Sequence, residues 1–365
     1  MRVSNFYSIV FTGGPCAGKT TILSITKQYL ESYGLRVVVL SEAPTELINA
    51  GLPPWCEWKD PLRFQVHLLR YVIAREDRYR AMMNDLSTEK PTVLLCDRGA
   101  LDGMAYVGRN NFLKVIEECG YSLQELRERY KAVIHLVTAA LGAEEFYTLD
   151  NNAARTESMD LARGIDSRTL DAWLGHPHHD VVGNEEGGFE KKKFRALQSL
   201  TRVLGMPEAL ERERKFVVLN FHPSMIPENA VCVEIEQTYL VTTEGGPQRR
   251  VRKWTVDGVT TYFETHKVDT GEKGVRKESE EIITLSVYEE RLLERDPNKK
   301  PIRKKRWCFY VANQKCELDV FERIPLVLLE REVQNMDDKL VHPPGMELEE
   351  VTGDPAYDNS VLASR

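Results

Sequence analysis

A glycine-rich segment near the start of the chain has the residue types and spacing of a phosphate-binding loop. Gly13, four further residues and then Gly18-Lys19-Thr20 match the P-loop pattern. Glycine permits the tight turn that points backbone N–H groups at one anion, and a helix N-terminus adds partial positive charge. Lys19 and Thr20 would then bind the β/γ-phosphates and Mg²⁺. The predicted nucleoside triphosphate site comprises Gly13, Gly14, Pro15, Cys16, Ala17, Gly18, Lys19, Thr20 and Thr21.

Two carboxylates follow apolar runs that are typical of buried strands. Glu42 comes after residues 36–40, and Asp97 comes after residues 91–96. The carboxyl ends of parallel strands border the ligand crevice of such a sheet, so both acids are candidates for catalysis. Asp97 is also our candidate Mg²⁺ ligand with Thr20, although an acid at this position can instead cap a helix.

Residues 141–174 are polar and rich in arginine. In phosphoryl-transfer proteins a mobile segment often supplies arginines to the charge that develops on the transferred group. Arg155 and Arg168 are the candidates for this role. The alternative is a pair of solvated helices, because helical arginines usually lie on the surface.

These candidates need a scaffold that brings strand ends together. Strand-like runs at 7–11, 36–40, 91–96 and 132–137 alternate with helical periodicity. This alternation predicts an α/β domain with a parallel sheet covered by helices on both faces.

The second half of the chain has a different pattern, with polar residues two positions apart in seven strand-like segments. In the first segment Glu234, Glu236 and Thr238 share one face. A solvated sheet face explains any single segment, but the set favours charged residues inside a closed antiparallel β-barrel, where acids and bases offset each other. The expected tunnel residues, which would bind a polyphosphate and a divalent cation, are Glu234, Glu236, Arg250, Arg252, Lys267, Lys304, Arg306, Glu317, Asp319, Glu330 and Glu332.

The net charge and the lengths of the apolar runs argue against some classes of protein. A net charge of −7 argues against general nucleic-acid binding. No apolar run approaches the ~20 residues of a membrane span, so we expect no transmembrane segment and a cytoplasmic protein. The change of periodicity predicts a nucleotide-binding domain at 1–222, a barrel domain at 223–337 and a flexible tail at 338–365.

The first half resembles P-loop kinases of the ribosylnicotinamide kinase group through GGPCAGKTT, SEAPTE and DRGALD. Glu42 followed by Trp55 and Trp58, together with Asp97-Arg98, also resembles deoxynucleoside kinases. That resemblance implies that Glu42 takes the proton from an acceptor hydroxyl group.

The second half resembles the CYTH, or triphosphate tunnel, domain over about residues 230–335, with EIEQT at the position of its opening motif. The motif's lysine is Thr238 here, which argues against triphosphate hydrolysis more than against ligand binding. The tandem order of the two domains resembles the TRPL translocation defect protein-like family. That resemblance implies binding of GTP and of acidic phospholipid such as phosphatidic acid, peripheral membrane contact and a role in membrane-protein traffic.

The sequence thus supports a regulatory protein that binds GTP or ATP with Mg²⁺ and holds an anionic ligand in its tunnel. The alternatives are a kinase acting on a nucleoside-like or ribosylnicotinamide-like acceptor and a metal-dependent triphosphatase. No Asn-Lys-x-Asp guanine motif is present, so GTP is implied by the resemblance alone.

Overall fold

The computed structural model divides into two compact units after Leu200. The sequence pattern puts this division near residue 222. The difference arises because β6 (Glu211–Val218) hydrogen-bonds to strands of the second unit, although its own apolar end at 216–219 resembles one more strand of the first. The structure describes residues 6–86, 90–147, 158–184, 188–206, 211–242, 246–271, 275–312, 314–333 and 336–365, without the side chains of 211, 269 and 276–279.

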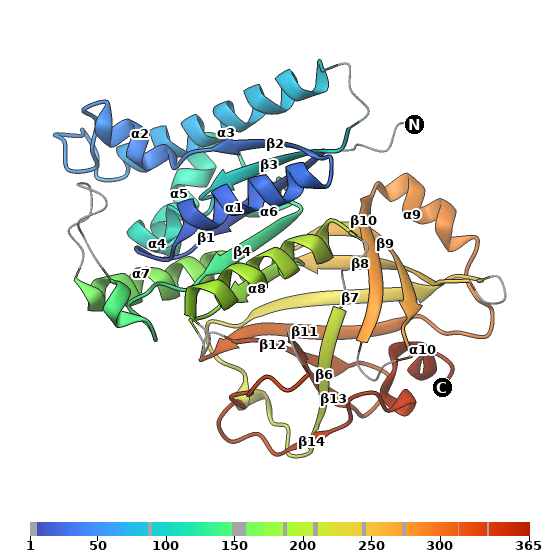
Figure 1. Ribbon diagram of the computed structural model, residues 1–365. Helices are drawn as coiled ribbons and strands as arrows, with labels where there is room; N and C mark the ends of the chain where they lie inside the picture. The colour runs from blue at the N-terminus through green and yellow to red at the C-terminus, as the bar shows by residue number, and fades with distance from the viewer. Residues whose placement is uncertain are drawn as a thin grey trace. The chain divides into compact units, whose positions relative to one another are not determined.

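The first unit is built on a five-stranded, fully parallel sheet with strand order β2-β3-β1-β4-β5. Each central strand is an uninterrupted apolar run because both faces of the sheet are covered. Figure 1 shows these strands in blue to green, surrounded by helices. The strands are β1 (Phe6–Thr12), β2 (Arg36–Leu40), β3 (Thr92–Asp97), β4 (Ala132–Leu136) and β5 (His179–Val182).

Helices pack on both faces of this sheet. Val10, Leu94 and Val133 share one core with residues of α3, α5 and α6, whereas α1 contacts β1, β2 and β3. The predicted α/β class is therefore confirmed. The helices are α1 (Lys19–Ser32), α2 (Ala43–Asn49), α3 (Arg63–Asn84), α4 (Met104–Val107), α5 (Arg109–Cys119), α6 (Leu123–Glu128), α7 (Met159–Ala172) and α8 (Gly188–Val203).

The second unit is an antiparallel sheet with strand order β10-β9-β8-β7-β11-β12-β13-β6-β14. Pairing of β10 with β6 closes eight of these strands into a barrel, as the sequence predicts. The remaining elements are β7 (Val231–Tyr239), β8 (Gln248–Val256), β9 (Val259–Asp269), β10 (Val275–Ile283), α9 (Leu285–Leu292), β11 (Ile302–Val311), β12 (Gln314–Phe321), β13 (Val327–Glu332), β14 (Leu348–Glu350) and α10 (Asn359–Leu362).

The last residues of the chain are packed against the barrel, whereas the sequence predicts a flexible tail at 338–365. β14 pairs with β6, and Leu362 and Ala363 are buried against Tyr239, Ile302 and Phe321. The tail lacks periodicity because it contributes only short elements, whose apolar contacts lie far away in the sequence. No helix within the described ranges is long and apolar enough to cross a membrane.

Candidate functional site

The loop between β1 and α1 has the backbone geometry of a phosphate cradle. Gly13 has φ +130°, and a Cβ there would lie 2.0 Å from the carbonyl oxygen of Leu136, so this position requires glycine. Gly18 adopts the left-handed conformation, with φ 80°, where α1 begins. The buried Lys19 donates from Nζ to the carbonyl oxygens of Gly13 (3.1 Å) and Gly14 (3.0 Å), which keeps its ammonium group at the loop.

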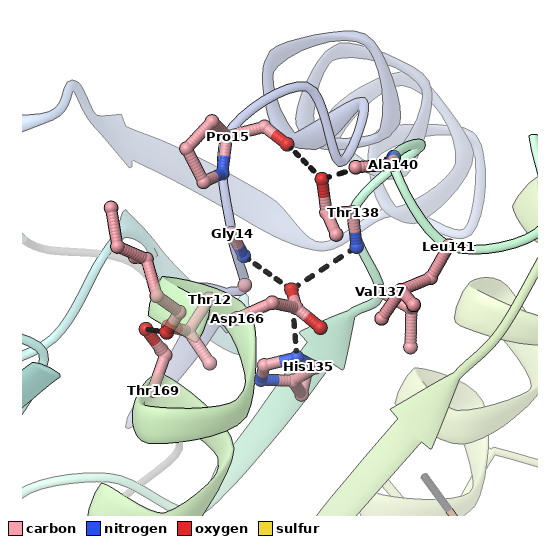
Figure 2. Close-up of polar contacts among 12 residues, drawn as sticks. Thr12, Gly14, Pro15, His135, Val137, Thr138, Ala140, Leu141, Asp166 and Thr169 are labelled. Atoms are coloured by element: carbon pink, nitrogen blue, oxygen red, sulfur yellow. Dashed lines mark hydrogen bonds and ion pairs between the residues drawn. The ribbon is translucent and has the colours of Figure 1, made fainter. Parts of the chain in front are cut away.

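Asp166 of α7 fastens this loop to the segment after β4 (Figure 2). Its Oδ1 accepts hydrogen bonds from the backbone N–H groups of Gly14 (2.6 Å) and Thr138 (3.1 Å), and His135 Nε2 lies 3.3 Å away. The Thr138 hydroxyl in turn donates to the carbonyl oxygen of Pro15. The carboxylate is fully buried and thus ties three separate segments together. Sequence reasoning missed Asp166, because its partners lie 152 and 28 residues away.

We expect Asp166→Ala to weaken nucleotide binding by about tenfold or more. The substitution leaves two buried N–H groups without an acceptor, each worth about 1–3 kcal/mol, and it frees the cradle from α7. Asp166→Asn keeps an acceptor oxygen and should restore much of the affinity. Asp160→Ala, on the same helix but with its side chain 91% exposed, is the control. Calorimetric titration with ATP and GTP measures the effect, and wild-type affinity in Asp166→Ala would contradict it.

Glu42, Asp97 and Arg98 meet beside the P-loop. Arg98 donates to the carboxylate of Glu42 and lies 3.7 Å from Asp102, and Thr45 donates to Glu42 at 2.7 Å. Although burial opposes the shift, Arg98 and Lys19 lower the pKa of Glu42 to about 2. Glu42 is therefore a carboxylate at neutral pH.

Burial raises the pKa of Asp97 to about 6, with Lys19 opposing the shift and Glu42 adding to it. Oδ1 of Asp97 is buried and has no hydrogen-bond partner within the described part of the chain. Thr20 and Asp97 line one cleft, and hydroxyl and carboxylate oxygens are the hard ligands that Mg²⁺ prefers. This donor set fits the expected Mg²⁺ site.

Two adjoining hollows are built around these residues. A cleft of about 1,560 Å³ follows the P-loop from Cys16 to Thr21, and a narrower cavity of about 340 Å³ lies under α2 and α3. Glu42, Thr45 and Asp97 line both. Both hollows therefore border the two carboxylates of Glu42 and Asp97.

Of the two arginines expected to contact the transferred group, the one that the structure describes, Arg168, is not brought to this site. Arg168 is exposed, donates from Nε to the carbonyl oxygen of Ala105 (2.6 Å) and lines neither hollow. Its position on α7 directs it toward α4 instead. Arg155 lies outside the described residues.

The cleft contains a lysine that the sequence does not single out. Lys192 of α8 is 4% exposed and donates from Nζ to the carbonyl oxygen of Val137 (2.6 Å) and to Asn184 Oδ1 (2.7 Å). Burial lowers the pKa of Lys192 to about 7; Asp166 opposes this and Lys19 adds to it. In the sequence Lys192 stands between two other lysines, a pattern that normally indicates a solvated helix face.

In the second unit, nine of the expected tunnel residues share the inner face of the barrel by strand register. Arg306 is central, because its guanidinium contacts Glu317, Asp319 and Glu330, and Lys304 contacts Asp319 as well. The inward-facing expected residues are Arg250, Arg252, Lys267, Lys304, Arg306, Glu317, Asp319, Glu330 and Glu332.

Glu234 and Glu236 do not face the barrel interior, contrary to our expectation. Their side chains are 64% and 32% exposed and pair with Lys305 (3.8 Å) and Arg303 (2.7 Å). The register puts Ile235 opposite Lys304, so the apolar side of β7 faces inward instead. Thr238 shares the outer face with the two glutamates. Glu332 is on the inner side of β13 by register, at the end of the strand, where it pairs with Arg202 (2.9 Å) and its side chain is 32% exposed.

Strand β6 supplies inner residues that sequence reasoning missed. Lys215 lies 3.0 Å from Glu330. Burial and Glu330 raise the pKa of Glu213 to about 7, while Lys215 opposes the shift. The alternating residues of the segment ERERKFVV are a sequence signal for a barrel strand. The predicted boundary at residue 222 instead puts this segment in the nucleotide-binding domain.

We expect Arg306→Ala to destabilise the barrel by about 3–5 kcal/mol, because three buried carboxylates lose their shared partner. Arg303→Ala, on the same strand but with its side chain 55% exposed, should cost less than about 1 kcal/mol. Urea unfolding of the full-length protein, followed at the transition of the second unit, compares them. Equal midpoints for the two variants would refute the buried network.

Comparison with known proteins matches residues 8–192 to a family described as AAA domain, which is just over half of the chain. No curated protein matches the sequence. A solved inorganic triphosphatase is 30% identical, covering 42% of this chain and 95% of that one, with a TM-score of 0.32. A thymidylate kinase from Ehrlichia chaffeensis is 17% identical, covering 48% and 92%, with a TM-score of 0.32. A protein from Pyrococcus horikoshii OT3 is 19% identical, covering 35% and 80%, with a TM-score of 0.29.

The family match covers the P-loop, the strand ends with Glu42 and Asp97, and α7. The first unit is thus a nucleotide-binding domain of the P-loop type. The chain belongs to the AAA domain family.

Proposed function

We propose that the first unit transfers the terminal phosphoryl group of a nucleoside triphosphate to a hydroxyl group of a small molecule. The observation that carries this proposal is the second cavity, which shares Glu42, Thr45 and Asp97 with the P-loop cleft. A protein that only binds or hydrolyses a nucleotide has no need of an acceptor pocket there. The geometry therefore favours the kinase alternative over a purely regulatory role.

Different residues of the site have different roles in such a transfer. The P-loop N–H groups and Lys19 hold the phosphates, and Thr20 and Asp97 would hold Mg²⁺. When bound, Mg²⁺ neutralises charge on the β- and γ-phosphates. Glu42, ionised at neutral pH, orients the acceptor hydroxyl and takes its proton. The acceptor oxygen bonds to the γ-phosphorus as the bond to the β-phosphate oxygen breaks, and the nucleoside diphosphate leaves.

The test is acceptor-dependent product formation by the full-length protein. ATP or GTP with Mg²⁺ is incubated with nucleosides and ribosylated pyridines, and mass spectrometry detects the phosphorylated acceptor alongside the diphosphate. The proposal requires a matching amount of both products. Nucleotide binding, or hydrolysis to phosphate, that never depends on any acceptor would exclude a kinase.

For the second unit we propose a binding site for an anionic polyphosphate inside the barrel. Among the side chains that the structure describes, seven cations and six acids face inward by strand register, and the cations support this proposal. The cations are Lys215, Arg250, Arg252, Lys267, Lys304, Arg306 and Lys315, and the acids are Glu213, Glu280, Glu317, Asp319, Glu330 and Glu332. Inorganic triphosphate, titrated with and without Mg²⁺, tests for binding and for hydrolysis.

GTP preference, phosphatidic acid binding, a trafficking role and membership of the TRPL translocation defect protein-like family remain predictions from the sequence. Two basic segments, at 249–253 and 299–306, could meet anionic headgroups, but some of their arginines are already engaged or face inward. Arg252 and Arg306 face inward, and Arg249 contacts both Glu264 (3.0 Å) and Glu294 (2.8 Å). These contacts favour a ligand inside the barrel over a lipid surface.

A further inference from the structure

Residues 355–363 pack against the inner face of the barrel at one of its ends. They include η3 (Pro355–Tyr357) and α10, and their buried side chains, Leu362 and Ala363, share a core with four barrel residues. Each of the four belongs to the inner face, because its cross-strand neighbour also faces inward. They are Tyr239, opposite Arg250; Ile302, opposite Gln237; Phe321, opposite Lys304; and Leu328, opposite Asp319.

The four barrel residues lie at the same end of neighbouring strands. Tyr239 and Phe321 are the last residues of β7 and β12, whereas Ile302 and Leu328 stand at the start of β11 and β13. In an antiparallel sheet the end of one strand lies beside the start of the next. Val217, near the end of β6, packs against the same core. The segment therefore covers the ends of five neighbouring strands.

Hydrogen bonds fasten the segment on two sides of this end. The backbone N–H of Lys300, just before β11, donates to the carbonyl oxygen of Ala363 (2.7 Å). On β6 the ammonium group of Lys215 donates to the carbonyl oxygen of Tyr357 (3.4 Å). The backbone N–H of Lys215 also donates to the hydroxyl group of Thr352 (3.0 Å). Apolar packing and hydrogen bonds thus close this end of the barrel.

The charged inner side chains become more exposed toward the opposite end. The side chains of Lys304 and Asp319, next to the closed end, are 3% and 0% exposed. Those of Arg306 and Glu317, one step further along β11 and β12, are 9% and 10% exposed. At the far end of β13 the side chain of Glu332 is 32% exposed. Among the described residues, solvent therefore reaches the interior from the end that Glu332 marks.

We infer that the barrel is a pocket with one entrance, and that it accepts the free end of a linear polyphosphate rather than the middle of a threaded chain. A terminal phosphate carries about 1.5–2 negative charges near neutral pH, as a phosphate monoester does, and an internal phosphate carries less. The terminal phosphate therefore enters deepest, toward Lys215 and Lys304. This inference rests on the polyphosphate site proposed above, since it says which part of that ligand the site accepts.

An ester on both ends of the chain should prevent this mode of binding. The probes are tripolyphosphate, its ester with one terminal phosphate methylated, and the diester with both terminal phosphates methylated. They are titrated calorimetrically into the full-length Lys19→Ala protein, in which the P-loop no longer competes for phosphates. We expect the monoester to bind within about threefold of tripolyphosphate. The diester should bind about tenfold more weakly or worse, because neither of its ends can meet the deep cations as a free phosphate.

Opening the closed end should remove this discrimination. Added to the Lys19→Ala protein, Leu362→Asn places an amide in the apolar contact, and deletion of residues 353–365 removes the contact altogether. In both variants the diester should bind about tenfold more tightly than before, while tripolyphosphate affinity changes less than about threefold. Val361→Asn, on the same helix but with Val361 39% exposed, is the matched control and should discriminate like the Lys19→Ala protein. The diester also carries less charge, so the comparison between proteins isolates the effect of the closed end.

The outcomes separate this inference from the proposed site. If tripolyphosphate binds but the diester binds equally well, or if the deletion leaves the discrimination unchanged, the barrel has no closed end and the inference alone is wrong. If tripolyphosphate binds none of the proteins, the polyphosphate site is wrong and the inference falls with it. Circular dichroism and retained tripolyphosphate binding establish that the variants are folded.

Discussion

Lys19→Ala abolishes measurable nucleotide binding by the full-length protein. The ammonium group of Lys19 is held at the cradle by the carbonyl oxygens of Gly13 and Gly14, from where it would contact the β- and γ-phosphates. Charge-assisted hydrogen bonds are worth about 1.5–3 kcal/mol each, so losing two weakens binding by about 100-fold or more.

The control for this experiment is Lys114→Ala, at an exposed position of α5 that lines neither hollow. Calorimetry with ATP and GTP in the presence of Mg²⁺ compares both variants with the wild type. Circular dichroism and thermal unfolding establish that the variants are folded. A Lys19→Ala protein that is folded and binds nucleotide with wild-type affinity would reject the P-loop assignment.

Glu42→Gln should reduce kcat by about 10²–10⁴-fold, the usual contribution of a positioned general base. The amide has nearly the same shape but cannot take the acceptor proton, and it replaces the carboxylate that Arg98 contacts. Nucleotide affinity should change little, because the P-loop backbone and Lys19 supply the phosphate contacts. The loss should therefore fall on turnover rather than on nucleotide KM.

Glu46→Gln is the matched control for Glu42→Gln. Glu46 lies on α2, which begins directly after Glu42, and it contacts Arg75 (2.6 Å) and Tyr71 (2.8 Å), but it lines only the wider cleft. Steady-state kinetics with the acceptor found in the product screen measures both variants. A similar fall in kcat for both would mean that Glu42 acts through the structure of α2 and not as a base.

Much of the fold and of the candidate site of the first unit can be predicted from the sequence, because the patterns that indicate them are local. The P-loop spacing, the apolar strands and the acids at strand ends each occupy a few consecutive residues, and parallel sheets collect strand ends at one edge. Asp97 and Glu42 were found in this way. Asp166 and Lys192 were not, since each is defined by partners from other elements.

In the barrel, by contrast, the sequence pattern does not determine which residues face inward. Alternation along β7 separates Glu234 and Glu236 from Val233 and Ile235, but alternation alone does not say which side faces inward. The side is decided by register, and a shift of one residue exchanges the two faces of a strand. In the structure Lys304 lies opposite Ile235, so the glutamates of EIEQT lie outside.

By itself the sequence determined the phosphate cradle, the parallel α/β class of the first unit and the antiparallel class of the second, because these depend on spacing and periodicity within short segments. Only the tertiary structure decided that β6 belongs to the barrel, that the end of the chain packs against it and that residues of α3 line a cavity beside Glu42. These features depend on contacts between residues far apart in the chain, and a pattern of neighbouring residues carries no information about such contacts.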